Sequence, residues 1–177
     1  MAVHVRRLGS RRTPGEGLRL GTVRRPPRGV RKTDYASRDY FDVWLPELTP
    51  SAKLVEWALS KPFTPERWRR FVQAYRREMQ SAQSERILEI LAQLSRQAHF
   101  SVGCYCEREE VCHRSILIEL LAEHGAKVAR GNKAWAPVHN RLPRRGRRTA
   151  RERSDDQVEI SKGARWSEKR GSRWRLG

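Results

Sequence analysis

The sequence predicts a single small α/β domain with a mainly parallel sheet flanked by helices, followed by a basic disordered C-terminal tail. Two observations favour this fold class. Segments with the two-residue period of strands alternate with segments of helical period. The last of them run strand, helix, strand, which is the order of a parallel right-handed crossover. We therefore expect the domain over residues 1–129 and the tail over residues 130–177 of the 177-residue chain.

Three strands are expected near the N-terminus. The first covers residues 1–8, where apolar and polar residues alternate before a turn rich in Gly and Pro. The second covers residues 18–22 or, alternatively, 20–23, and the third covers residues 41–45. A basic loop over residues 24–32 lies between the last two, and its two prolines and one glycine favour a rigid turn.

Three helices are expected next. Thr49 as N-cap and Pro50 as first residue open a helix that ends at Pro62. The same signals at residues 64–65 open a second helix, and a third is expected near residues 84–97. Apolar residues at helical spacing give each helix a buried side: Leu54, Trp57 and Leu59, then Trp68, Phe71, Val72, Tyr75 and Met79, then Ile87, Leu88, Leu91 and Leu94.

The reactive side chains gather where a strand leads into a helix. Residues 99–105 are expected to form a buried strand, residues 115–125 a helix closed by a glycine, and residues 126–129 a last short strand. Ligands of open parallel sheets bind at the carboxyl ends of strands, where the following helix presents free N–H groups. The segment at that position holds Cys104, Cys106, Cys112, His113 and Arg114.

This placement favours an anion pocket that contains a nucleophile. A thiol at a helix N-terminus has a lowered pKa, so Cys112 is the expected nucleophile. His113 is the expected acid or base, with an ordinary pKa of about 6.5. Arg114, together with Arg28 and Gly29 of the basic loop, is expected to bind a phosphate or carboxylate group. The alternative for the loop is a solvated basic surface.

Two other interpretations of the cysteine segment stay open. Cys104, Cys106, Cys112 and His113 have the atom types of a zinc site, although their spacing is compact for one. A purely structural interpretation makes Cys104 a small core residue of the strand. Apart from zinc in the first alternative, no cofactor is expected.

The net charge of +18 is carried by the two ends of the chain. Lys and Arg against Asp and Glu number 11 to 3 over residues 1–40, 12 to 12 over 41–129 and 15 to 5 over 130–177. Such basic extensions are typical of attachment to nucleic acid, and tryptophans among arginines favour base stacking. The residues expected to bind nucleic acid are Arg144, Arg145, Arg147, Arg148, Trp166 and Trp174.

We expect a cytoplasmic protein without a membrane segment. No run approaches the roughly 18 apolar residues of a bilayer span, and the N-terminus lacks a hydrophobic signal segment. Three clustered cysteines do not favour a disulfide framework. A nucleic acid or a nucleotide is the expected partner, and no protein partner is indicated.

Three stretches together resemble the YeaO-like proteins, the family called domain of unknown function 488, over about residues 3–129. They are the segment from Cys104 to Arg114, the Pro-Arg-Gly-Val at residues 27–30, and residues 44–51. The resemblance implies a compact, cytoplasmic, bacterial-type α/β domain and says little about activity. This chain has Pro26 where many relatives have tryptophan, and Cys106 where many have glutamate.

The leading functional hypothesis is a pocket between the Pro-Arg-Gly loop and the cysteine loop that holds a phosphate-bearing ligand, such as a nucleotide or a nucleic-acid end. Whether that pocket catalyses a reaction is left open. One alternative is a non-catalytic nucleic-acid-binding protein that acts through its basic ends. Another is a module stabilised by zinc through the cysteine cluster.

Overall fold

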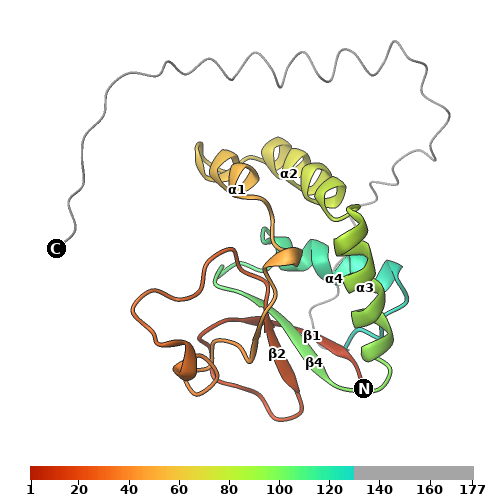
Figure 1. The fold of residues 1–177 in the computed structure, drawn as a ribbon. Coiled ribbons are helices and arrows are strands. Elements are labelled where there is room, and N and C mark those ends of the chain that lie inside the picture. The colour runs from red at the N-terminus through yellow and green to blue at the C-terminus, as the bar shows by residue number, and fades with distance from the viewer. Residues whose placement is uncertain (130–177) are drawn as a thin grey trace. The chain divides into compact units, whose positions relative to one another are not determined.

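The sheet has four strands, all parallel, in a computed structural model that describes residues 1–129 (Figure 1). Its strands are β1 (Val3–Arg7), β2 (Leu18–Gly21), β3 (Val43–Trp44) and β4 (Phe100–Cys104), and their order is β1-β4-β2-β3. The predicted α/β class with a parallel sheet is therefore confirmed. The tail predicted over residues 130–177 lies outside the described residues.

Strand β4 is the central strand, and every one of its residues is buried. Val102 of β4 pairs with Val5 of β1 on one side and with Leu20 of β2 on the other. A strand in the middle of a parallel sheet is covered on both faces, which accounts for the burial of all five residues of β4. The short strand predicted over residues 126–129 is reduced to an isolated parallel bridge between Val128 and Val3.

The described residues form four α-helices: α1 (Ala52–Leu59), α2 (Pro65–Glu78), α3 (Ala82–Leu94) and α4 (His113–Glu123). The predicted start of α1 is wrong, because its N-cap is Ser51, whose Oγ accepts the Leu54 N–H at 3.2 Å. Leu59, predicted to be buried, is 79% exposed at the last turn of α1. Helix α2 begins at the predicted signal, with the Thr64 hydroxyl accepting from the Arg67 N–H.

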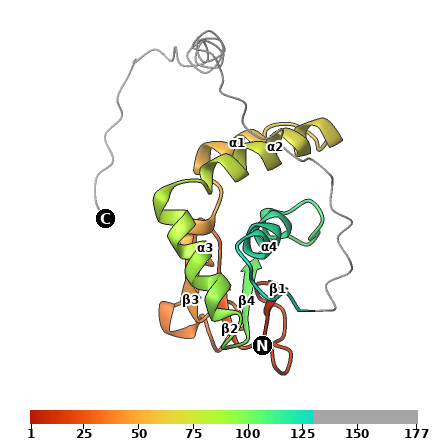
Figure 2. The ribbon, with the colours of Figure 1, turned by 90° about the vertical axis from the view of Figure 1, so that its right-hand side faces the viewer.

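Helices α1 and α2 lie above the sheet in both ribbon views, at the end towards which the strands run (Figures 1 and 2). The main core joins them to the sheet and to α3 and α4. Tyr75 of α2 is fully buried in this core, and its hydroxyl donates to the Leu48 carbonyl at 2.7 Å. A helical pair is thereby fixed over the carboxyl ends of β2 and β4, where the cysteine segment begins.

A buried ion pair between Arg19 of β2 and Glu16 of the β1–β2 loop ties neighbouring loops to the sheet. Arg19 is fully buried, and its Nε donates to Glu16 Oε1 at 2.8 Å. The same carboxylate accepts from Arg6 Nε at 2.9 Å and from the Thr13 N–H at 3.0 Å. Because Arg19 also donates to the Asp39 carbonyl, this network joins the β1–β2 loop to the segment before β3.

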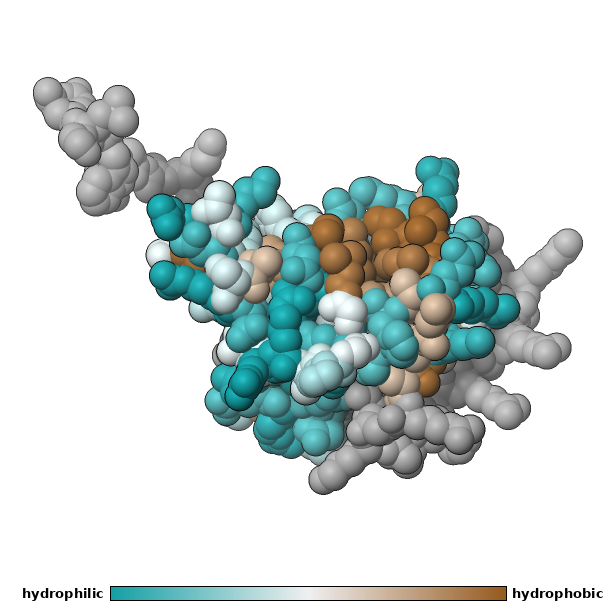
Figure 3. All heavy atoms as spheres, turned by 90° about the horizontal axis from the view of Figure 1, so that it is seen from below, coloured by the Kyte–Doolittle hydropathy of each residue, from teal (hydrophilic) through white to brown (hydrophobic). Residues whose placement is uncertain are grey.

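Figure 3 shows one face of the molecule, which is mostly hydrophilic and on which apolar residues gather into a patch with hydrophilic residues around it. Within residues 1–129, none of the helices has the length and apolar character that crossing a bilayer requires.

Candidate functional site

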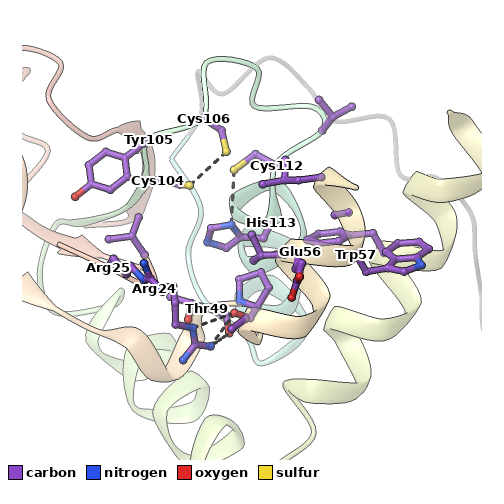
Figure 4. A pocket seen from close by; sticks show the side chains of 18 of the residues that line it. Arg24, Arg25, Thr49, Glu56, Trp57, Cys104, Tyr105, Cys106, Cys112 and His113 are labelled. Carbon is purple, nitrogen blue, oxygen red and sulfur yellow. Dashed lines mark hydrogen bonds between the residues drawn. The ribbon is translucent and has the colours of Figure 1, made fainter. Parts of the chain in front are cut away.

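The three cysteine sulfurs come together at the carboxyl end of the central strand. Cys104 is the last residue of β4, Cys106 lies in the loop that follows, and Cys112 is the N-cap of α4. Their three Sγ atoms all lie within 4.8 Å of one another, and Cys104 Sγ is 3.5 Å from Cys106 Sγ (Figure 4). We call these three residues the thiol cluster. The sequence predicted that this segment holds the reactive side chains, and the fold adds their proximity.

Burial divides the thiol cluster into one accessible and two enclosed sulfurs. Cys106 is exposed, whereas Cys104 and Cys112 are buried and pack with Leu8, Val23 and other apolar residues in a small second core. The Cys104 thiol donates to Cys106, which raises the pKa of Cys104 and lowers the pKa of Cys106. The nearby Cys104 and Cys106 sulfurs and burial raise the pKa of Cys112.

The prediction of a lowered pKa at Cys112 is therefore wrong. The helix N-terminus does lie at this residue, but the other two sulfurs and the apolar surroundings disfavour a thiolate there more strongly. The accessible sulfur with the lowered pKa belongs to Cys106. Sequence reasoning assigned Cys106 to the alternative metal site and not to the nucleophile, because its closeness to Cys104 and Cys112 depends on how the loop folds back.

His113 is buried beside the thiol cluster and is held through both ring nitrogens. Its Nε2 donates to the Thr22 carbonyl at 2.8 Å, and its Nδ1 lies 3.8 Å from Cys112 Sγ. The expected pKa of about 6.5 is wrong, because burial lowers it to about 4. At neutral pH His113 is thus uncharged, with an Nδ1 lone pair directed at Cys112.

Arg114 fixes the backbone of the cysteine loop. It is 2% exposed, and its Nη1 donates to the Arg6 carbonyl at 2.9 Å while its Nη2 donates to the Cys106 carbonyl at 2.8 Å. Weaker bonds reach the Cys104 and Glu107 carbonyls. The prediction of a free anion clamp at Arg114 is wrong, because the guanidinium is used by main-chain carbonyls and does not line the cavity described next.

A cavity of about 1050 Å³ opens over the thiol cluster. The segment before and including Arg28, the α1 helix, the start of α2 and the cysteine loop form its walls (Figure 4). The predicted location between the Pro-Arg-Gly loop and the cysteine loop thus corresponds to a real hollow. Its charged lining consists of five cations, Arg24, Arg25, Arg28, Lys61 and Arg67, and one carboxylate, Glu56.

Two of the five cations support the cavity wall. Arg24 donates to the Pro50 carbonyl at 2.7 Å, and Arg67 donates to the Trp57 carbonyl while its guanidinium lies 4.4 Å from the Trp57 ring centre. Arg25, Arg28 and Lys61 have no ion-pair or hydrogen-bond partner among the described residues.

Gly29 does not line the cavity, contrary to its predicted place in the anion site. Its φ of 71° lies in the left-handed region, which glycine adopts readily, so it shapes the turn after Arg28. Sequence reasoning also missed much of the cavity wall. Trp57 and Trp68 were predicted as core residues, yet both are half-buried and line the cavity. The signal was present in the aromatic and basic residues on either side of Pro62.

The fold and the site define a small parallel α/β protein with a thiol cluster at the carboxyl end of its central strand. The chain belongs to the domain-of-unknown-function 488 family: a family model described as the active DUF488-N3 subclade matches residues 3–125. This confirms the resemblance drawn from the sequence. No curated protein and no solved structure matches the chain.

The residues expected to bind nucleic acid, from Arg144 to Trp174, lie outside residues 1–129. Their role stays a prediction.

Proposed function

We propose that the cavity binds a phosphate-bearing ligand of nucleotide type and presents it to the thiol of Cys106. The observation that carries this proposal is the composition of the cavity lining, in which five cations and one carboxylate surround an opening onto three sulfurs. No other feature of the described residues combines an accessible reactive side chain with so much charge of one sign.

The charge favours an anionic ligand. Arg25, Arg28 and Lys61 line the cavity without protein partners, and unpaired cations around a hollow attract phosphate groups. The cavity lining contains one carboxylate, the exposed Glu56, against five cations. Arginine is the better phosphate ligand of the two cation types because its planar donors match two phosphate oxygens at once.

The size and the aromatic lining favour a ligand that also has a flat ring. Ligand pockets commonly have volumes of roughly 300–1000 Å³, so this cavity has room for a nucleotide or a strand end. Trp57 and Trp68 supply ring faces in the wall formed by α1 and α2, and Trp68 is already stacked on Phe71 with ring centres 5.3 Å apart. Stacking on aromatic side chains is a general way to hold a base.

In this proposal Cys106 is the reactive sulfur that faces the ligand, and its neighbours favour the thiolate form. Cys104 donates a hydrogen bond to the Cys106 sulfur, which stabilises the thiolate. His113 stays neutral and accepts from the Cys112 thiol, so it keeps the third sulfur in place. The description of the matching family model as an active subclade supports chemistry at this site over a purely structural cluster.

The test is protection of Cys106 against iodoacetamide, followed by mass spectrometry at pH 7. Inorganic phosphate, pyrophosphate and a nucleoside monophosphate are the probes, and we expect the nucleotide to slow alkylation most. Arg25→Gln and Arg28→Gln should each weaken this protection by roughly 10-fold to 100-fold, since each removes a charged hydrogen bond. Arg86→Gln is the matched control, because Arg86 is an exposed residue of α3 outside the cavity. Alkylation that no probe slows would contradict the proposal.

A second proposed function is a zinc site in the thiol cluster, which the mutual distances of the sulfurs favour. Zinc–sulfur bonds of about 2.3 Å in a tetrahedron place sulfurs about 3.8 Å apart, close to the 3.5 Å between Cys104 and Cys106. His113 Nδ1, 3.8 Å from Cys112 Sγ, can supply a fourth ligand, and the hydrogen bond from Nε2 to the Thr22 carbonyl fixes the orientation of the ring.

Elemental analysis of the purified chain separates the two functions. A zinc site predicts about one zinc per chain, which Cys112→Ser should abolish, together with a lower melting temperature after chelation. Protein that contains no zinc when grown with added zinc, and that melts at the same temperature with and without chelator, would exclude this alternative.

A further inference from the structure

We infer that Cys106 and Cys104 form a peroxide-oxidisable pair, in which Cys106 is oxidised first and Cys104 closes an intramolecular disulfide with it. The inference rests on the arrangement of these two sulfurs and does not depend on any ligand of the cavity. It assigns a modification site, with hydrogen peroxide or an organic hydroperoxide as the class of reagent.

The distance between the two sulfurs is the first argument. Cys104 Sγ and Cys106 Sγ are 3.5 Å apart, which is non-bonded contact, and an S–S bond of about 2.05 Å needs an approach of only about 1.5 Å. Only Tyr105 lies between the two residues. Cys106 lies in the loop after β4, so movement of this loop can join the two sulfurs without separating β4 from its neighbouring strands.

The second argument is the unequal exposure of the two thiols. Cys106 is exposed, so a peroxide in solution can reach it, whereas Cys104 is 7% exposed at the end of β4. An accessible cysteine with an enclosed neighbour in contact is the arrangement that turns a sulfenic acid into a disulfide before further oxidation.

The third argument is the support that Arg114 gives to the pair. Its Nη2 donates to the Cys106 carbonyl at 2.8 Å and its Nη1 donates to the Cys104 carbonyl at 3.4 Å. One buried guanidinium thus holds the backbone of both cysteines. Cys112 Sγ also lies within 4.8 Å of the other two sulfurs, but it has no counterpart to the 3.5 Å sulfur–sulfur contact of Cys104 and Cys106 and lies beside His113 Nδ1 at 3.8 Å. Cys104 is accordingly the partner that closes the disulfide.

The reaction balances in two steps. The Cys106 sulfur attacks one peroxide oxygen, so that an S–O bond forms, the O–O bond breaks, and the released hydroxide leaves as water after taking the thiol proton. The Cys104 sulfur then attacks the Cys106 sulfur, so that the S–S bond forms, the S–O bond breaks, and hydroxide leaves as a second water with the Cys104 proton. The two sulfurs lose two electrons, and the peroxide gains them.

Trypsin makes the test direct, because it separates the two cysteines of the pair from the third. Cleavage after Arg96, Arg108 and Arg114 yields a peptide of residues 97–108, with Cys104 and Cys106, and a peptide of residues 109–114, with Cys112. The full chain is treated with hydrogen peroxide, blocked with iodoacetamide and digested. We expect the first peptide to be lighter by two hydrogen atoms and unalkylated, and the second to be alkylated. Treatment with dithiothreitol before the iodoacetamide should restore both thiols of the first peptide, so that both are then alkylated.

Three variants assign the order of events. Cys106→Ser should abolish the disulfide, and Cys112→Ser should leave it at the wild-type level. Cys104→Ser should leave a sulfenic acid on Cys106 that dimedone captures. If Cys104→Ser does not fold, the wild-type peptide map decides alone. Linked peptides 97–108 and 109–114 as the main product, or direct oxidation of Cys106 to sulfinic acid, would overturn the inference. Nucleotide protection of Cys106 is measured separately, so failure of one proposal leaves the other testable.

Discussion

The Nη2 atom of Arg114 donates to the carbonyl oxygen of Cys106 at 2.8 Å, from a side chain that is 2% exposed. This contact joins the first turn of α4 to the loop that follows β4. A residue that sequence reasoning places among the ligand-binding groups thus acts on the main chain instead, and the accessible sulfur of the thiol cluster sits directly beside it.

Arg114→Lys is expected to lower the free energy of unfolding by about 2–4 kcal/mol, because a single ammonium group cannot reach the carbonyls on both sides that the guanidinium spans. It should also slow formation of the Cys104–Cys106 disulfide, since the loop backbone is no longer held. Urea denaturation measures the first effect and the tryptic peptide map the second. Arg108→Lys, an exposed change in the same loop, serves as control. Equal stability of Arg114→Lys and wild type would contradict the structural role.

Glu16→Gln is expected to cost about 3–5 kcal/mol, since it leaves the fully buried Arg19 without its charged partner. Burial by itself raises the pKa of Glu16, but hydrogen bonds from the Thr13 N–H, Arg19 and Arg6 outweigh it and lower the pKa to about 2. The folded state therefore binds this proton less readily than the unfolded state. The resulting stability, about 3 kcal/mol, is present above the unfolded value of 4.5 and is lost as the pH falls to about 2.

The measurement is the free energy of unfolding in urea at several values between pH 2 and pH 7. The wild type should lose more stability than Glu16→Gln over the acidic part of this range. Glu89→Gln, on the exposed side of α3, is the control and should follow the wild type. Parallel curves for wild type and Glu16→Gln would show that the ion pair contributes no such pH dependence.

Trp57→Leu is expected to weaken nucleotide binding by roughly 5-fold to 140-fold, the equivalent of one base stack of about 1–3 kcal/mol. Trp57 lines the cavity from α1, and Arg67 covers its ring. The control is Trp44→Leu, because Trp44 is on β3 outside this cavity. Titration followed by protection of Cys106 gives both affinities. An unchanged affinity for Trp57→Leu would place the base elsewhere.

Deletion of residues 130–177 removes 15 basic and 5 acidic residues, which is +10 of the net charge of +18. If the basic ends bind nucleic acid, the full chain should bind a single-stranded oligonucleotide with an affinity that falls steeply as salt rises. The truncated chain should lose most of this affinity and have a smaller slope against salt. Fluorescence anisotropy at several salt concentrations measures both. Equal affinity of the full and the truncated chain would contradict the prediction that residues 130–177 bind nucleic acid.

Most of the fold is encoded locally in the sequence. The alternation before Leu8, the Thr64-Pro65 signal and the apolar run into Cys104 each predict an element that the structure contains. These signals depend on neighbouring residues, because periodicity, caps and turns are properties of short segments. Local signals did not fix the start of α1. Thr49 and Ser51 are both residue types that commonly cap helices, and the structure shows that Ser51 is the N-cap.

The sequence by itself determined the α/β class, the family and the segment that holds the reactive side chains. Only the tertiary structure decided which sulfur is accessible, that Arg114 holds main-chain carbonyls, and that α1 and α2 bring Trp57 and Arg67 to the same cavity as Cys106. The physical reason is that burial, pKa and charge convergence depend on residues far apart in the chain. Cys112 has the sequence position of an activated thiol, and the packing around it raises its pKa instead.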